Sequence, residues 1–281
     1  IMDIIEKITQ EFNLQPEHVK NIVALLDDGN TIPFIARYRK EMTGHIDDQV
    51  LRDFADRLTY LRNLEERKAD VKKAIEEQGK LTDEIVESLL KAETLTEVED
   101  IYRPYKQKKK TRASVAIAKG LQPLADIMYA QDVKEGTVED LAKPYVDEEK
   151  GVKNEKEAIQ GAMDIIAEMV SDDAELRKKL RNIFLKLATI STKFVKGKDE
   201  EEGASTYEMY KDYSEPVSEI KSHRVLAINR GEDEGFLKVK VEIDEEFAVR
   251  VCSVGKVKEG SVTTQNVKDA IADSYDRLIA P

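Results

Sequence analysis

The sequence predicts a mainly α-helical protein, a multi-helix scaffold organised on one long helix over about residues 48–78, with a small β-hairpin inserted near residues 224–243. Apolar residues recur at helical spacing through most of the chain before residue 200. The longest of these patterns begins after the capping pair Asp47 and Asp48 and ends at a glycine. Alternating apolar and charged residues appear in the hairpin region, as in a strand with one wet face.

The first two helices are expected to be short. Residues 2–12 carry isoleucines and Phe12 at helical spacing, and Pro16 stands at the first position of a second helix that ends near Gly29. This tight hairpin resembles a helix-turn-helix, but its second helix offers mostly apolar residues and few cations for reading a DNA groove. We therefore expect it to have a packing role.

The long helix is expected to be the spine on which shorter elements pack. At about 1.5 Å per residue it would extend roughly 45 Å. Its charged residues alternate in sign, which is typical of a solvated face. Its apolar residues lie along one side and are Leu51, Phe54, Leu58, Leu61, Leu64, Val71 and Ile75.

Further helices follow the spine. Thr82 and Thr94 are N-cap candidates, and the helix begun at Thr94 is expected to end before Pro104. Residues 157–170 and 172–187 carry two apolar stripes separated by a short break. This spacing predicts an antiparallel pair and a second helix-turn-helix-like element.

A charged run at residues 198–203 marks an expected change of organisation. It separates a helical region, residues 2–200, from a central region, residues 201–281. The central region is expected to hold the β-hairpin and a terminal helix.

The hairpin is predicted from two short apolar runs. Residues 224–229 are the first strand, residues 230–235 are the turn, and residues 236–243 are the second strand, in which apolar and charged residues alternate. The terminal helix carries apolar residues from Val267 to Leu278.

Composition limits the possible classes of protein. The chain has 281 residues and a formal net charge of −12, which argues against a protein that coats nucleic acid with its whole surface. No apolar run approaches the roughly 18 residues that a membrane span needs. The single Cys252 cannot form an internal disulfide. We therefore expect a cytoplasmic protein with no membrane partner.

No pattern in the sequence predicts a catalytic, metal or cofactor site. His18, His45 and His223 are the only histidines, and none lies within one helical turn of another. His45 is near Asp47 and Asp48, but these two aspartates are better explained as helix caps.

Two lysine–glycine dipeptides, at residues 119–120 and 150–151, fall short of a phosphate-binding loop. Both lack the spaced partner glycine and the terminal Ser or Thr. We therefore expect no enzyme activity, no metal and no cofactor.

One segment departs from the acidic balance of the chain. Residues 100–112 hold six cations against the single carboxylate of Asp100. Such cations can follow successive phosphates, and tyrosines can add base stacking that tolerates any sequence. The alternative to nucleic-acid contact is that this segment is a solvated loop, or a loop whose cations pair with acidic residues. The candidate nucleic-acid-binding residues here are Tyr102, Arg103, Tyr105, Lys106, Lys108, Lys109, Lys110 and Arg112.

A second basic cluster lies in residues 31–41. Phe34 and Ile35 are too apolar to remain in water, so this segment is expected to dock onto the rest of the chain. The candidate nucleic-acid-binding residues that follow them are Arg37, Arg39 and Lys40.

Three separated strings carry a family resemblance. Residues 31–41 read TIPFIARYRKE, residues 99–106 read EDIYRPYK, and residues 224–231 read RVLAINRG. In this order they resemble the bacterial Tex family of transcription accessory proteins, and the resemblance runs from about Met2 to Pro281.

The resemblance implies an N-terminal piece truncated before a ribonuclease-H-like domain. In Tex-like proteins that domain is regarded as inactive, and it is followed by helix-hairpin-helix repeats and an S1 domain, the principal nucleic-acid binder. RNA or DNA would then be bound mainly through domains absent here.

These observations lead us to expect the non-catalytic scaffold portion of a nucleic-acid-binding transcription accessory factor. It would support interactions with nucleic acid and with the transcription machinery, with RNA polymerase or ribosome-associated machinery as candidate partners. An autonomous nucleic-acid-binding module working through residues 102–112 is one alternative. A protein-docking platform is another, if apolar surface near Phe34 or near Leu278 and Ile279 is exposed.

Overall fold

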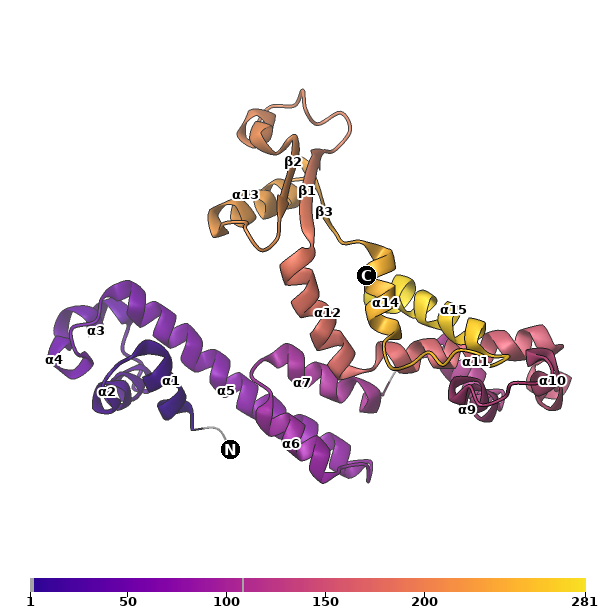
Figure 1. Ribbon diagram of the computed structural model, residues 1–281. Helices are drawn as coiled ribbons and strands as arrows, with labels where there is room; N and C mark the ends of the chain where they lie inside the picture. The colour runs from indigo at the N-terminus through magenta and orange to yellow at the C-terminus, as the bar shows by residue number, and fades with distance from the viewer. Residues whose placement is uncertain (1–2, 108) are drawn as a thin grey trace. The chain divides into compact units, whose positions relative to one another are not determined.

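The computed structural model describes residues 3–107 and 109–281, and within them the chain is mainly α-helical, as predicted (Figure 1). The chain divides into two compact units, one ending at Lys106 and the other running from Gln107 to Pro281. The division into regions at residue 200 stays a prediction. No helix among the described residues is long and apolar enough to cross a membrane.

The first unit, in its described part, consists of helices and their connections. They are α1 (Ile4–Phe12), α2 (Pro16–Asp27), α3 (Ile32–Tyr38), α4 (Lys40–Thr43), α5 (Asp48–Glu77), α6 (Asp83–Lys91), α7 (Leu95–Tyr102) and the 3-10 turn η1 (Arg103–Tyr105). The long helix predicted over residues 48–78 is confirmed as the 30-residue α5. Its N-cap is Asp47, whose Oδ1 accepts a hydrogen bond from the amide of Val50 at 2.8 Å.

The core of the first unit lies along one side of α5. Helices α1, α3, α6 and α7 all pack against it. Phe54 meets Phe12 of α1 with ring centroids 5.5 Å apart, and burying a side chain of this size contributes about 1.5–3 kcal/mol. The predicted apolar positions are all buried: Leu51, Phe54, Leu58, Leu61, Leu64, Val71 and Ile75. The long helix is therefore the packing centre of this unit.

The second unit carries the remaining helices. They are α8 (Arg112–Ala118), α9 (Gln122–Ala130), α10 (Val138–Ala142), α11 (Glu155–Ser171), α12 (Ala174–Leu187), α13 (Ser222–Asp233), α14 (Glu245–Ser253) and α15 (Thr264–Ser274). Short turns are η2 (Lys143–Tyr145), η3 (Glu148–Lys150), η4 (Ala204–Tyr210) and the π-helical η5 (Tyr275–Ile279). The predicted terminal helix corresponds to α15 and η5.

Helix α11 is the centre of the second unit, with α8, α9, α10 and α15 packed against it. Gly161 allows this packing, because a Cβ placed on it would lie 2.3 Å from Cδ1 of Leu121. Ser274 of α15 donates to the backbone oxygen of Ala167 at 2.6 Å and fixes α15 on α11. The helices predicted at residues 157–170 and 172–187 are confirmed as α11 and α12. However, α12 packs against α14 and does not lie back along α11 as an antiparallel partner (Figure 1).

The predicted β-hairpin at residues 224–243 is wrong in its first strand. Residues 224–229 belong to helix α13, and only the second strand forms, as β3 (Leu237–Glu242). It pairs with β1 (Thr189–Phe194), which also pairs with β2 (Asp212–Pro216), in an antiparallel sheet of order β2-β1-β3. Thr192 of β1 stands opposite Tyr213 on one side and Val239 on the other.

The reason for this error is visible in the packing of α13. A short apolar run suits a strand or a buried helix equally well. Val225 and Ile228 are three residues apart on one helix face, and Ile228 is fully buried beside Leu237 and Tyr207. Gly231, assigned to a turn, lies inside the helix, where a Cβ would come within 2.5 Å of Leu237 Cδ1.

Candidate nucleic-acid interface

The basic segment predicted at residues 102–112 is divided between the two units. Its first part, as far as Lys106, belongs to the first unit, and the part from Gln107 belongs to the second. Lys108 lies outside the described residues. Lys106 and Lys109 are exposed.

The tyrosines of this segment pack against the core of the first unit. Tyr102 and Tyr105 are both partly buried there. The guanidinium carbon of Arg67 lies 5.4 Å from the ring centroid of Tyr102, and the backbone oxygen of Tyr105 accepts from Gln78 Nε2 at 2.7 Å. Arg103 is also half-buried, with an Nε that has no hydrogen-bond partner among the described residues. The tyrosine rings thus contribute to packing in the first unit, and base stacking by them stays a prediction.

A bidentate ion pair holds α7, just before this segment, onto the spine helix. Arg67 donates to the two carboxylate oxygens of Glu99 at 2.5 and 3.2 Å. This hydrogen bonding lowers the pKa of Glu99, with burial opposing it and the Arg67 charge adding to it. Arg67 therefore serves the fold of the first unit.

The second predicted cluster lies on α3 and α4. Thr31 caps α3 by accepting from the amide of Phe34 at 3.3 Å, and Ile35 is fully buried. The docking expected for this segment is therefore confirmed. Arg39 lies over the ring of Phe34, 5.1 Å from its centroid. The side chains of Arg37, Tyr38, Arg39 and Lys40, with their neighbours, line a shallow hollow of about 440 Å³.

The side chains of this cluster remain in water. Arg37, Arg39 and Lys40 are exposed, and in the described part of the chain none of them forms an ion pair. Their role in nucleic-acid binding stays a prediction.

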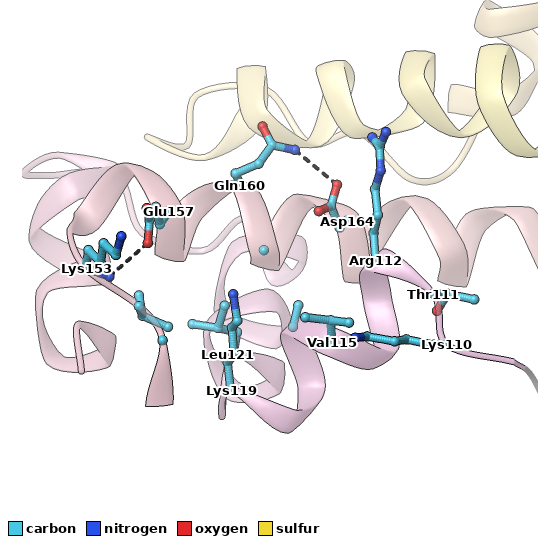
Figure 2. Close-up of a pocket in the computed structure, with 14 residues that line it drawn as sticks. Lys110, Thr111, Arg112, Val115, Lys119, Leu121, Lys153, Glu157, Gln160 and Asp164 are labelled. Atoms are coloured by element: carbon cyan, nitrogen blue, oxygen red, sulfur yellow. Dashed lines mark hydrogen bonds between the residues drawn. The ribbon is translucent and has the colours of Figure 1, made fainter. Parts of the chain in front are cut away.

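A larger groove of about 740 Å³ lies in the second unit, between α8, the start of α11 and the turn that follows η3. Figure 2 shows Glu157, Gln160 and Asp164 along α11, with Arg112, Val115 and Lys119 on the facing segment. Two predicted residues, Lys110 and Arg112, line it directly. Part of the predicted basic segment is therefore brought to a concave surface.

Local hydrogen bonds position the start of α8 at this groove. The hydroxyl of Thr111 accepts from the amide of Ser114 at 3.0 Å, and Ser114 Oγ accepts in return from the amide of Thr111 at 2.8 Å. Thr111 Oγ1 also donates to Glu168 Oε2 of α11 at 2.9 Å. This reciprocal capping box fixes the backbone that carries Lys110 and Arg112.

Three lysines that were not predicted as binding residues also lie at this groove. Lys119 and Lys153 line it, and Lys150 lies beside the Lys119–Gly120 turn. Within the described residues, none of the five groove cations forms an ion pair with a carboxylate. The only available signal was the pair of lysine–glycine dipeptides, which lie in different parts of the sequence.

The rest of the groove is partly apolar and partly polar. Its apolar lining is formed by Val115, Ala116, Leu121 and Val152. On α11, Gln160 Nε2 donates to Asp164 Oδ1 at 3.0 Å, and Glu157 Oε2 accepts from the amide of Lys153 at 2.9 Å. The groove therefore combines an apolar lining with cations and with the carboxylate and amide groups of α11.

Neither a metal centre nor a reactive thiol is seen in the part of the chain that the structure describes. Its His, Cys, Asp and Glu side chains form no group of three that could hold a metal ion. Burial raises the pKa of the Cys252 thiol, so this thiol is protonated at neutral pH.

The architecture is that of a mainly helical, acidic chain whose second unit carries a groove lined by several cations. The sequence matches the family described as Tex-like protein N-terminal domain over residues 2–76, and the family described as Tex central region-like over residues 134–275. The chain therefore belongs to the Tex family.

Curated relatives agree with this assignment. The chain is 43% identical over 277 residues to YdcI of Bacillus subtilis, covering 98% of the chain. It is 44% identical over 241 residues to the transcriptional accessory protein Tex of Neisseria gonorrhoeae, covering 86%. It is 30% identical over 298 residues to the human S1 RNA-binding domain-containing protein 1, covering 99%. The chain spans 38%, 31% and 29% of the lengths of these three relatives.

Proposed function

We propose that this chain is the non-catalytic scaffold portion of a nucleic-acid-binding transcription accessory factor that works in the cytoplasm. Membership of the Tex family supports the proposal. So do the names of two relatives, a transcriptional accessory protein and an S1 RNA-binding domain-containing protein. RNA or DNA is the ligand, and RNA polymerase or ribosome-associated machinery is the proposed protein partner.

The observation that carries this proposal is that the apolar residues are buried in the helical cores while the groove cations form no ion pair. Large apolar faces of α5 and α11 are used in the two helical cores. The groove cations, by contrast, have no carboxylate partner among the described residues, although the chain has a net charge of −12. A polyanion would supply that missing charge, and its counterions would be released on binding.

A salt titration tests the scaffold role. Fluorescent single-stranded RNA is titrated with the whole chain and, separately, with a longer Tex-family relative, at several salt concentrations. We expect the chain to bind weakly and with the smaller slope of log K against log salt, at about 0.7 per phosphate contacted. Equal affinity and equal slope would instead favour an autonomous nucleic-acid-binding module. Turnover of a phosphodiester substrate by the purified chain would overturn the non-catalytic assignment.

A second experiment tests the protein partner. RNA polymerase is captured on the immobilised chain before and after nuclease treatment. Capture that survives the nuclease supports direct interaction with the transcription machinery. Loss of capture after the nuclease would show that nucleic acid bridges the two proteins, and this result would overturn the direct contact.

A further inference from the structure

We propose that the groove between α8 and α11 holds one unpaired nucleotide of a single-stranded nucleic acid, with a backbone phosphate on Lys119, Lys150 and Lys153. The inference rests on the proposed contact with nucleic acid and goes beyond it, because it gives that contact a place and a strand preference.

The first observation is the reciprocal packing of two lysine–glycine turns. A Cβ on Gly151 would lie 3.4 Å from Lys119 Cε, and a Cβ on Gly120 would lie 3.6 Å from Lys150 Nζ. Both glycines have positive φ, +79° at Gly120 and +88° at Gly151, which side-chain-bearing residues rarely adopt. Each lysine therefore lies against the turn that carries the other lysine.

This packing brings like charges together. Lys153 follows two residues after Gly151 and also lines the groove. In the part of the chain described, no carboxylate forms an ion pair with these three lysines, although Glu157 and Asp164 of α11 also line the groove, so part of their mutual repulsion remains. A phosphate oxygen accepts hydrogen bonds from ammonium groups and carries the opposite charge. One phosphate beside the two turns would relieve the repulsion.

The remaining lining suits the base of the same nucleotide. Val115, Ala116, Leu121 and Val152 offer an apolar surface on which a flat base can lie. Gln160 and Asp164, joined by their 3.0 Å hydrogen bond, retain free acceptor lone pairs for the polar edge of a base. The groove therefore matches both ends of a nucleotide.

The size of the groove favours a single strand over a duplex. Its volume of about 740 Å³ lies within the range of small-ligand pockets, about 300–1,000 Å³. An unpaired base can be splayed out into such a space, whereas a paired base is enclosed in its stack. Lys110 and Arg112 at the other end of the groove would then contact a neighbouring phosphate.

The test compares matched double variants of the whole chain. Lys119→Ala with Lys150→Ala removes two groove charges, and Lys134→Ala with Lys211→Ala removes two exposed charges of the same unit outside the groove. Binding of a single-stranded RNA 12-mer is measured by anisotropy at several salt concentrations. Thermal unfolding confirms that all variants fold.

We expect the groove variant to lose roughly tenfold or more in affinity, since two charge-assisted contacts disappear. Its salt slope should fall by about 0.7, which corresponds to the one phosphate contact proposed beside the two turns. The control variant should change affinity by less than about threefold, as expected for exposed charges. Replacing both groove lysines by arginine should retain most of the binding.

Three results would overturn the inference and leave the scaffold function standing. They are equal losses in groove and control variants, equal affinity for a duplex of the same sequence, and no binding of the chain at low salt. Equal affinity for an oligo-glutamate peptide of the same charge would assign the groove to an acidic protein partner and would also overturn it. Different results would overturn the scaffold function itself. They are turnover of a phosphodiester substrate by the chain, or an RNA affinity of the chain equal to that of a longer Tex-family relative.

Discussion

Cations of the first unit and cations of the groove are used in different ways. Along α5, Arg57 pairs with Glu11 at 2.8 and 2.7 Å, and Arg62 pairs with Asp27 at 2.7 and 2.9 Å. Arg67 forms the same kind of bidentate pair with Glu99. The groove of the second unit holds mainly lysines, and in the described residues they have no carboxylate partner.

The chemistry of the two side chains explains the contrast. The planar guanidinium fork matches a carboxylate with two parallel hydrogen bonds, so it fixes one helix against another. An ammonium group is a compact charge on a flexible stem and can follow a phosphate. In the first unit these arginines are therefore neutralised within the fold, whereas the groove cations are the ones that the proposed nucleic-acid ligand would neutralise.

The largest expected effect is a loss of stability in the first unit that leaves the groove of the second unit intact. Phe54→Ala removes a fully buried ring that packs on Phe12, and we expect a loss of about 3–5 kcal/mol in the first unit. Urea unfolding of the whole chain measures it, with Leu226→Ala as a control at a 69% exposed position. Oligonucleotide binding by the groove should persist in the Phe54 variant. Loss of oligonucleotide binding by the folded Phe54 variant in the absence of urea would show that the groove depends on the first unit.

A smaller effect is expected at the start of α8. Thr111→Val removes the N-cap acceptor and the hydroxyl donor to Glu168, and should cost about 1 kcal/mol. Because Lys110 and Arg112 flank this residue, RNA affinity should fall as well. Thr137→Val is a matched control, since Thr137 forms the same capping box on α10 with Asp140. Equal loss of affinity in both variants would contradict the role of the α8 cap in shaping the groove.

The parts of the fold that the sequence predicts are those determined locally. Helix α5 follows from a capping aspartate, a helical apolar pattern and a terminal glycine, all within one stretch. Strand β3 has a two-residue alternation that is also local. Its partner β1 lies far away in the sequence, and residues 224–229 are as apolar as a strand while packing as a helix. Only the tertiary core around Ile228 decides between these two states.

The candidate site was predictable in part for the same reason. Lys110 and Arg112 belong to a continuous basic run, which composition alone reveals. Lys119, Lys150 and Lys153 are separated in the sequence, and they come together where the Lys119–Gly120 turn packs against the Lys150–Gly151 turn. The tyrosines of the basic run look available in the sequence, yet the structure packs them against the first core. A basic run in the sequence does not predict which distant lysines lie near it or which of its own side chains are buried.

The smallest effect tests the electrostatic side of the comparison. The Arg67 hydrogen bond holds the pKa of Glu99 below its ordinary value of 4.5. The resulting stabilisation is therefore complete above pH 4.5 and is lost as pH falls through the lower, folded-state pKa. Both side chains are more than a third exposed, so we expect Glu99→Gln to cost only about 0.5–1 kcal/mol at pH 7.

Urea unfolding at pH 7 and pH 3, with exposed Glu66→Gln on α5, next to Arg67, as a control, measures this contribution. The difference between the original chain and the Glu99 variant should shrink at pH 3, because the Glu99 carboxyl of the unfolded chain is protonated there, and at high salt, where the pair is screened. A difference that depends on neither pH nor salt would mean that packing alone, including the ring of Tyr102, holds Arg67 in place. The arginines of the first unit would then differ from the groove lysines in their burial and not in their pairing.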